Sequence, residues 1–467
     1  MAPNENMARA SFCRLLLAAG ILHLTISVLI YLAGRLRLMP GVFDSNGISG
    51  GFAFDSFLYR DQAIKLVETL YDGWVADWFY APVALHVKLY SLPLAIFRPL
   101  FGFTMLGVEP LNLLYYLLII LLVFNLGWEV FNRRCGLLAA GIVALWPSLL
   151  LHTTQLLRDP LFIVCMLTLL LVSIRWLTRS YSLARGLLNG FIAGAASAVI
   201  WVTRYRMWTM ILGFTLLGLF FMSIRLLRER RWLAGNLAGA ALLLAMMVSI
   251  PTVVGKFLRP DFFLVEPGAA TSDASAQSRK SSTGSPPPST GSPQTIWSRL
   301  VKKADAMAVG LDNTRRDFFL SYPDAGSNID AQVRMSSAAD LLGYLPKAVA
   351  NGFLAPYPDM WLTAGSAVGL AGRLLSGLEM LAAYVIELLA VLGLWRGRRR
   401  LPVWLLAAVC VIGITALGLL VPNVAILFRL RYLFMVLLII PGAEGAIGVA
   451  LSWKSWKSQQ GAIKVDE

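Results

Sequence analysis

Three short segments of the chain carry arginines next to long apolar blocks. They hold, in order, Arg158 before Asp159 and Pro160, Arg204 and Arg206 around Tyr205, and Arg429 and Arg431 between Phe428 and Tyr432. Arginine presents a planar fork of donors that matches phosphate oxygens, and it stays charged at any working pH. If the three segments share one membrane face, they could bind a lipid-linked phosphate or pyrophosphate. The alternative, weighted equally, is that they reach ordinary lipid headgroups.

A second group of polar residues precedes these segments. Asp55 and Tyr59 are spaced to share one face of a helix, so Asp55 could act as a general base or substrate anchor. Spacing alone favours a helix N-cap for Asp55. Asp159 is also well placed to cap a helix, but capping does not explain Arg158. The chain has three histidines, which are too few to favour a metal cluster, so we expect His86 to make an interfacial polar contact.

Membrane-spanning helices must position these residues. Of 467 residues, 57% are hydrophobic and only 14% are charged, which excludes a soluble enzyme. The net charge of +15 indicates membrane orientation here rather than a nucleic acid partner. Blocks of about 20 apolar residues predict an all-α polytopic protein with about ten transmembrane helices. We place them at 12–33, 110–131, 136–154, 160–178, 186–202, 206–224, 232–252, 373–394, 402–421 and 431–451.

Basic residues of short loops predict the orientation, because Lys and Arg accumulate on the cytoplasmic side. They place both termini in the cytoplasm and leave 34–109, 155–159, 203–205, 253–372 and 422–430 outside. Within the first large loop, the apolar stretch from Trp78 to Gly102 is broken by Pro93 and Pro99 and predicts an interfacial helix. The four cysteines imply no disulfide framework.

The predicted domain organisation has three parts. Residues 1–252 form a transmembrane module with spans one to seven, 253–372 form a large loop-rich external segment, and 373–467 carry spans eight to ten with a short basic cytoplasmic tail. Within the external segment, 266–293 is rich in Ser, Thr, Pro and Gly and is expected to be disordered, whereas 295–358 is expected to form an ordered cap. Glu379, Glu387 and Glu444 lie within spans; we favour polar helix contacts for Glu387 and Glu444.

Several motifs resemble the GT-C superfamily of integral membrane glycosyltransferases, in particular the bacterial branch related to protein O-mannosyltransferases and to the enzyme that adds aminoarabinose to lipid A. The motifs are Asp55-Ser56-x-x-Tyr59-x-x-x-Ala63-x-x-Leu66, Phe131-Asn132-Arg133-Arg134-Cys135-Gly136, Leu145-Trp146-Pro147 and Arg158-Asp159-Pro160-Leu161. The sequence departs from the family where Ser56 follows Asp55, since many members have an adjacent acidic pair there.

The resemblance implies catalytic roles for Asp55, which would contact the acceptor or act as base, and for Asp159, which would assist. The lipid-phosphate contacts would come from external arginines, a role open to Arg158, Arg204, Arg206, Arg429 and Arg431. We also assign Tyr59, His86 and Lys88 to substrate binding. No cofactor is certain, and a divalent cation is possible.

The implied function is transfer of a sugar from a polyprenyl-phosphate donor to an envelope glycan, lipid or protein acceptor. It would occur on the periplasmic face of the bacterial inner membrane. One alternative is a polysaccharide polymerase or ligase acting on polyprenyl-pyrophosphate-linked glycans, which would need the arginines but not Asp55. A lipid or solute transporter ranks third, because the polar groups gather at one face rather than at the midplane.

Overall fold

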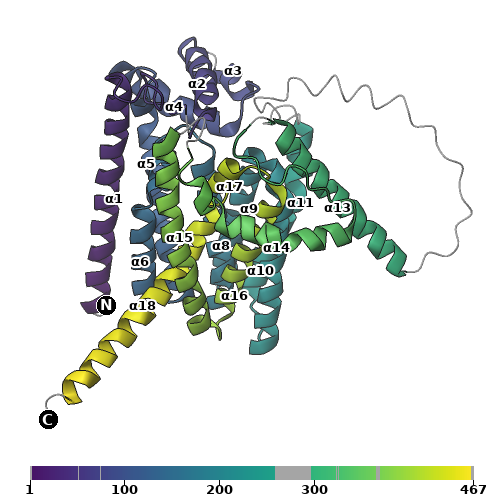
Figure 1. The fold of residues 1–467 in the computed structure, drawn as a ribbon. Helices are drawn as coiled ribbons and strands as arrows, with labels where there is room; N and C mark the ends of the chain where they lie inside the picture. The colour runs from purple at the N-terminus through teal and green to yellow at the C-terminus, as the bar shows by residue number, and fades with distance from the viewer. Residues whose placement is uncertain are drawn as a thin grey trace, which may run out of the picture. The chain divides into compact units, whose positions relative to one another are not determined.

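The computed structural model describes residues 3–50, 52–73, 75–257, 296–321, 323, 325–363 and 369–463, and in these ranges the elements are helical apart from two isolated β-bridges (Figure 1). The segment 266–293 lies outside the described residues. The chain forms two compact units. The first comprises 1–263, 378–410 and 433–467, and the second comprises 264–377 and 411–432.

The predicted spans are confirmed as helices. Within the described ranges, nine are long and apolar enough to cross a membrane, and a bent helix pair makes a tenth. The nine lie in α1 (Pro3–Arg35), α5 (Met105–Val130), α8 (Asp159–Thr178), α9 (Leu183–Thr203), α10 (Trp208–Glu229), α11 (Ala234–Phe257), α15 (Gly369–Gly397), α16 (Leu401–Leu420) and α18 (Tyr432–Ile463). Each of the ten predicted blocks falls on one of these helices or on the bent pair, because about 20 apolar residues can satisfy their backbone in lipid only as a helix.

The bent pair is the predicted third span. It consists of α6 (Arg133–Ala144) and α7 (Pro147–Thr153), which meet at 65°. Pro147 opens α7, and the backbone N–H and hydroxyl of Ser148 donate to the carboxylate of Glu379 on α15. Glu379 thereby satisfies donors that the break between the two helices would leave unpaired in an apolar region.

A second carboxylate also joins helices of the first unit. Glu444 of α18 accepts a hydrogen bond of 3.0 Å from Asn132 and lies 3.5 Å from the guanidinium of Arg396 on α15. The polar helix contact predicted for Glu444 is therefore present.

Glycines bring α9 and α11 into backbone contact. A Cβ on Gly190 would lie 2.3 Å from the carbonyl oxygen of Gly239, and one on Gly186 would overlap Gly235. In lipid, such small-residue faces let two helices approach closely enough for dispersion contacts to hold them together.

The first large loop forms three helices, α2 (Asp55–Tyr71), α3 (Val75–Tyr80) and α4 (Leu85–Phe101). Figure 1 shows them together at the end of α1 that is far from the N-terminus. The helix α4 contains Pro93 and Pro99 and is not among the helices of the described ranges that could span a membrane; its position at the interface stays a prediction.

The second unit contains α13 (Ile296–Ser321), α14 (Ala338–Leu354), η5 (Pro358–Met360) and α17 (Val424–Leu430), with the adjoining parts of α15 and α16. A capping box formed by Ser337 and Asp340 starts α14. Gly352 then packs α14 against α16, where a Cβ would lie 2.5 Å from the carbonyl oxygen of Ile414. Two helices, α13 and α14, thus lie in the segment 295–358, and its role as an external cap stays a prediction.

Candidate functional site

The turn that carries Arg158 is built by residues of the first loop. Ser56 of α2 donates to the Leu156 carbonyl at 3.1 Å, and the hydroxyl of Tyr90 on α4 lies 3.0 Å from the Leu157 carbonyl. Both side chains are fully buried. The turn therefore has a fixed position relative to α2 and α4.

A second anchor holds the other side of the same turn. The side-chain oxygen of Gln155 accepts from the Ser49 backbone N–H at 3.0 Å, and its amide donates to the Gly47 carbonyl at 3.1 Å. Gln155 is fully buried, so the loop before α2 and the turn before α8 form one rigid piece. Segments more than 100 residues apart thus meet at one end of the first unit, as expected for loops on the same membrane side.

Asp159 begins α8 and forms a buried ion pair with Arg204, which follows α9. Each side chain is 8% exposed. The guanidinium carbon of Arg204 also lies 5.2 Å from the ring centre of Phe162, one turn into α8. Two of the arginine-bearing segments predicted to share a face are therefore joined directly.

His86 lies close enough to this pair to feel its charges. It is 3% exposed, and its ring packs edge-on against Tyr59 at 4.5 Å between centres. Neither ring nitrogen has a hydrogen-bond partner among the described residues. Burial lowers the pKa of His86 to about 3, assisted by the positive charges of Arg158 and Arg204 and opposed by Asp159.

The imidazole is therefore neutral at working pH. A neutral ring can both donate and accept one hydrogen bond. Buried polar groups in native proteins nearly always have a partner, so His86 is a candidate hydrogen-bond partner for a bound substrate. The structure buries the His86 ring against Tyr59, and the interfacial contact expected for it stays a prediction.

The remaining predicted residues of the first unit have more varied surroundings. Asp55 is half-buried in the first turn of α2, whose N-cap is Phe54, so Asp55 does not occupy the N-cap position that its spacing favoured. Lys88 donates to the Phe79 carbonyl at 2.6 Å, which ties α3 to α4, and burial lowers its pKa. Arg206 is exposed, with its Nε 3.3 Å from the Tyr205 hydroxyl.

Arg429 and Arg431 belong to the second unit. Arg431 is 1% exposed and donates to the carbonyls of Gly352 and Phe353 at 2.9 and 2.8 Å. These carbonyls lie at the carboxyl end of α14, where a cation is favourable. The guanidinium of Arg431 thus holds the second unit together, while Arg429 is half-buried.

Sequence reasoning missed a polar cluster between α1, α5 and α7. His23 lies 2.7 Å from one carboxylate oxygen of Glu109, and Ser27 donates to the other at 2.8 Å. The second ring nitrogen of His23 lies 3.0 Å from the Thr153 hydroxyl. We began the second span at residue 110, one position after Glu109, whereas α5 begins at Met105. A carboxylate placed inside the span would have signalled a functional candidate.

The possible divalent cation has no evident ligand set in the described part of the chain. No group of three or more His, Cys, Asp or Glu side chains there could hold a metal ion. The carboxylate of Asp159 is taken up by Arg204.

Comparison with known proteins finds distant matches among solved structures. No protein-family model matches the chain, and no curated protein matches its sequence. The crystal structure of the apo oligosaccharyltransferase from Archaeoglobus fulgidus is similar, with a TM-score of 0.47 and 14% identity over 95% of this chain and 52% of that one. The archaeal oligosaccharyltransferase AglB from the same organism, solved with an inhibitory peptide and a dolichol-phosphate, gives 0.45 and 13% over 96% and 52%.

The chain is a polytopic membrane protein. Its described residues form helices, of which nine, or ten with the bent pair, could cross a membrane. It spans about half the length of the solved proteins that it matches.

Proposed function

We propose that the chain is a membrane glycosyltransferase of the GT-C type that moves a sugar from a polyprenyl-phosphate donor to a cell-envelope acceptor. One observation carries the proposal. At one end of the first unit, two arginines and an unpartnered neutral imidazole lie around the start of α8, beside the helix that bears Asp55. The group combines positive charge for a phosphate with a carboxylate for proton transfer.

The arginines would stabilise the leaving group. When the bond between the anomeric carbon and the phosphate oxygen breaks, negative charge develops on the polyprenyl phosphate. Arg158, Arg204 and Arg206, at the ends of α8 and α9, would supply the positive charge for it. Asp159 would orient the Arg204 guanidinium by holding one of its nitrogens, so the donor phosphate would meet a preorganised cation rather than a mobile one.

Asp55 would act as the base. Its carboxylate would take the proton of the acceptor hydroxyl as that oxygen attacks the anomeric carbon, so the proton ends on Asp55 and the electron pair on the phosphate. Its position in the first turn of α2, one helical turn before Tyr59, brings it to the helix that packs on His86. Tyr59 and His86 would line the sugar side of the site.

The test is transfer of radiolabelled sugar from polyprenyl-phosphate donors by membranes that contain the wild-type chain or a variant. We expect Asp55→Asn to lose at least a hundredfold in rate, as is typical when general base catalysis is removed. The matched control is Asp61→Asn on the same helix, whose carboxylate is 62% exposed and pairs with Arg60 at the surface. Full transfer by Asp55→Asn would refute the base assignment.

A second variant separates this proposal from the polymerase or ligase alternative. Loss of activity in Arg204→Ala, together with robust activity in Asp55→Ala, would favour an enzyme that uses polyprenyl-pyrophosphate without a first-loop base. Loss in both variants is expected for the glycosyltransferase.

A further inference from the structure

The second unit contains a cavity of about 240 Å³ that the proposed chemistry does not use. Its wall includes Arg315, Arg316, Arg334, Asp312, Phe319 and Pro422, contributed by α13, the segment before α14 and the turn before α17. Three guanidinium groups face one carboxylate, so the lining carries a net positive charge. The charge rule expects this segment on the same side as the candidate site.

One arginine gives the cavity a rigid wall. Arg315 is 3% exposed and donates to the Leu419 carbonyl at 3.1 Å and to the Asp330 carbonyl at 3.0 Å. Its guanidinium carbon also lies 5.0 Å from the ring centre of Tyr344. These contacts join α13 to two other segments, so the cavity is preformed before any ligand arrives.

The other two arginines remain available. Among the described residues, Arg316 makes no hydrogen bond or ion pair, and its side chain is exposed. Arg334 is 56% exposed and reaches Asp312 only at 3.8 Å, while Asp312 also accepts the Met335 backbone N–H at 3.1 Å. A pair this long and this exposed contributes little, so an incoming anion could take over the Arg334 guanidinium.

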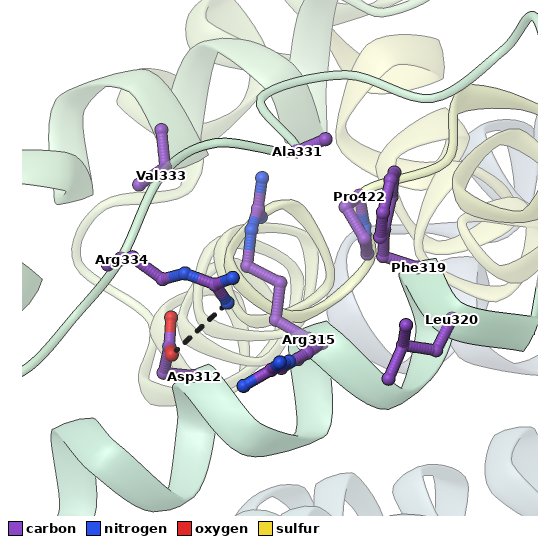
Figure 2. Close-up of a pocket in the computed structure, with 9 residues that line it drawn as sticks. Asp312, Arg315, Phe319, Leu320, Ala331, Val333, Arg334 and Pro422 are labelled. Atoms are coloured by element: carbon purple, nitrogen blue, oxygen red, sulfur yellow. Dashed lines mark ion pairs between the residues drawn. The ribbon is translucent and has the colours of Figure 1, made fainter. Parts of the chain in front are cut away.

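The opposite wall is apolar. Figure 2 shows the side chains of Phe319 and Pro422 on the side of the cavity away from Arg334 and Asp312. A bare anion would gain nothing from such a wall, whereas a sugar ring has apolar C–H faces that pack on an aromatic ring. The volume lies below the roughly 300–1,000 Å³ typical of pockets for drug-sized ligands, so it suits a single ring.

We infer that this cavity binds one acidic sugar residue of the acceptor, with the carboxylate or phosphate group on Arg316 and Arg334 and the ring against Phe319. The inference rests on the proposed function and deepens it, because it assigns the acceptor to the class of anionic glycans.

The test is binding of oligosaccharides to the full chain in lipid nanodiscs, measured by calorimetry without donor. The probes are a hyaluronan tetrasaccharide, which carries glucuronate carboxylates, and the neutral tetrasaccharide chitotetraose. We expect the anionic probe to bind and the neutral one to bind at least about tenfold more weakly, since a charge-assisted bidentate contact is lost. Equal binding of the two, or no binding of hyaluronan, would overturn the inference.

Variants then locate the site. Arg316→Gln and Arg334→Gln should each weaken hyaluronan binding about tenfold, and neither change removes a buried contact. The control Arg299→Gln removes an exposed arginine of the same helix, about 25 Å away along α13, and should leave binding unchanged. Unchanged affinity in the first two variants would place the ligand elsewhere. If inorganic phosphate competes for the cavity as strongly as hyaluronan does, the cavity binds a simple anion and the assignment of a sugar ring is wrong.

The two proposals can fail separately. Binding without any sugar transfer would keep the acidic-sugar site and remove the glycosyltransferase. Sugar transfer without hyaluronan binding would keep the glycosyltransferase and remove the acidic-sugar site.

Discussion

The buried pair between Asp159 and Arg204 should behave as a coupled unit. Removing one partner of a buried ion pair leaves an uncompensated charge and typically costs about 3–5 kcal/mol. Asp159→Asn should fall in that range, because both side chains are 8% exposed. Arg204→Gln should cost about 1 kcal/mol more, since it also removes the cation from the Phe162 ring. The double variant buries no unpaired charge and should lose only about 1–2 kcal/mol.

The assay is equilibrium unfolding of the purified protein by dodecyl sulfate, followed through its tryptophans. The control is Arg175→Gln at the other end of α8, where the arginine is 30% exposed and lies 3.4 Å from Glu129; it should cost at most about 1 kcal/mol. If the losses of the two single variants add in the double variant, the residues are not coupled and the reasoning fails. Sugar transfer should stay absent in the double variant even though stability recovers, because Arg204 is assigned to the donor phosphate.

Three further predictions concern packing and pH. Gly190→Leu should push α9 away from α11 and lower the yield of folded protein, whereas Gly141→Leu, where a Cβ meets nothing within 4 Å, should be tolerated; size-exclusion profiles compare the two. Because burial lowers the pKa of His86 to about 3 in the folded state, the unfolded state binds the proton first as the pH falls. Stability should therefore decline from about pH 6.5 toward pH 3 by up to about 1.4 kcal/mol per pH unit, and unfolding curves of His86→Phe should show a shallower decline. Burial raises the pKa of Asp330, but hydrogen bonds led by Lys347 outweigh it and lower the pKa. The stability that Asp330 gives the second unit should be present above its ordinary value near 4 and be lost at lower pH, and proteolysis of α14 should lose part of that acid sensitivity in Lys347→Met.

The membrane spans could be predicted because the requirement for a long apolar stretch applies to each segment of the chain by itself. An apolar block either is long enough to cross lipid or is not, and α4, interrupted by Pro93 and Pro99, failed that test in both sequence and structure. The side-chain pairings could not be predicted in the same way. Nothing near Asp159 in the sequence indicates that its partner follows α9, and nothing near Arg431 indicates that it closes α14.

Whether a polar side chain is buried inside the protein could not be predicted either. His86 sits in a stretch whose pattern predicts a helix at the membrane interface, and that pattern does not say which face of the helix another element will cover. The structure places Tyr59 of α2 on it. Exposure of a polar residue on an interfacial helix is thus decided by tertiary packing, which the spacing of apolar residues does not encode.

The contact between Ser148 and Glu379 has a consequence for the order in which the protein is made. The two residues are 231 positions apart, so at 5–20 residues per second the ribosome adds Glu379 about 12–46 s after Ser148. During that interval α7 lies in the membrane without the carboxylate that satisfies its first turn. Since α7 leads directly into the turn that carries Arg158, we expect this region to reach its native structure last, after α15 has entered the bilayer.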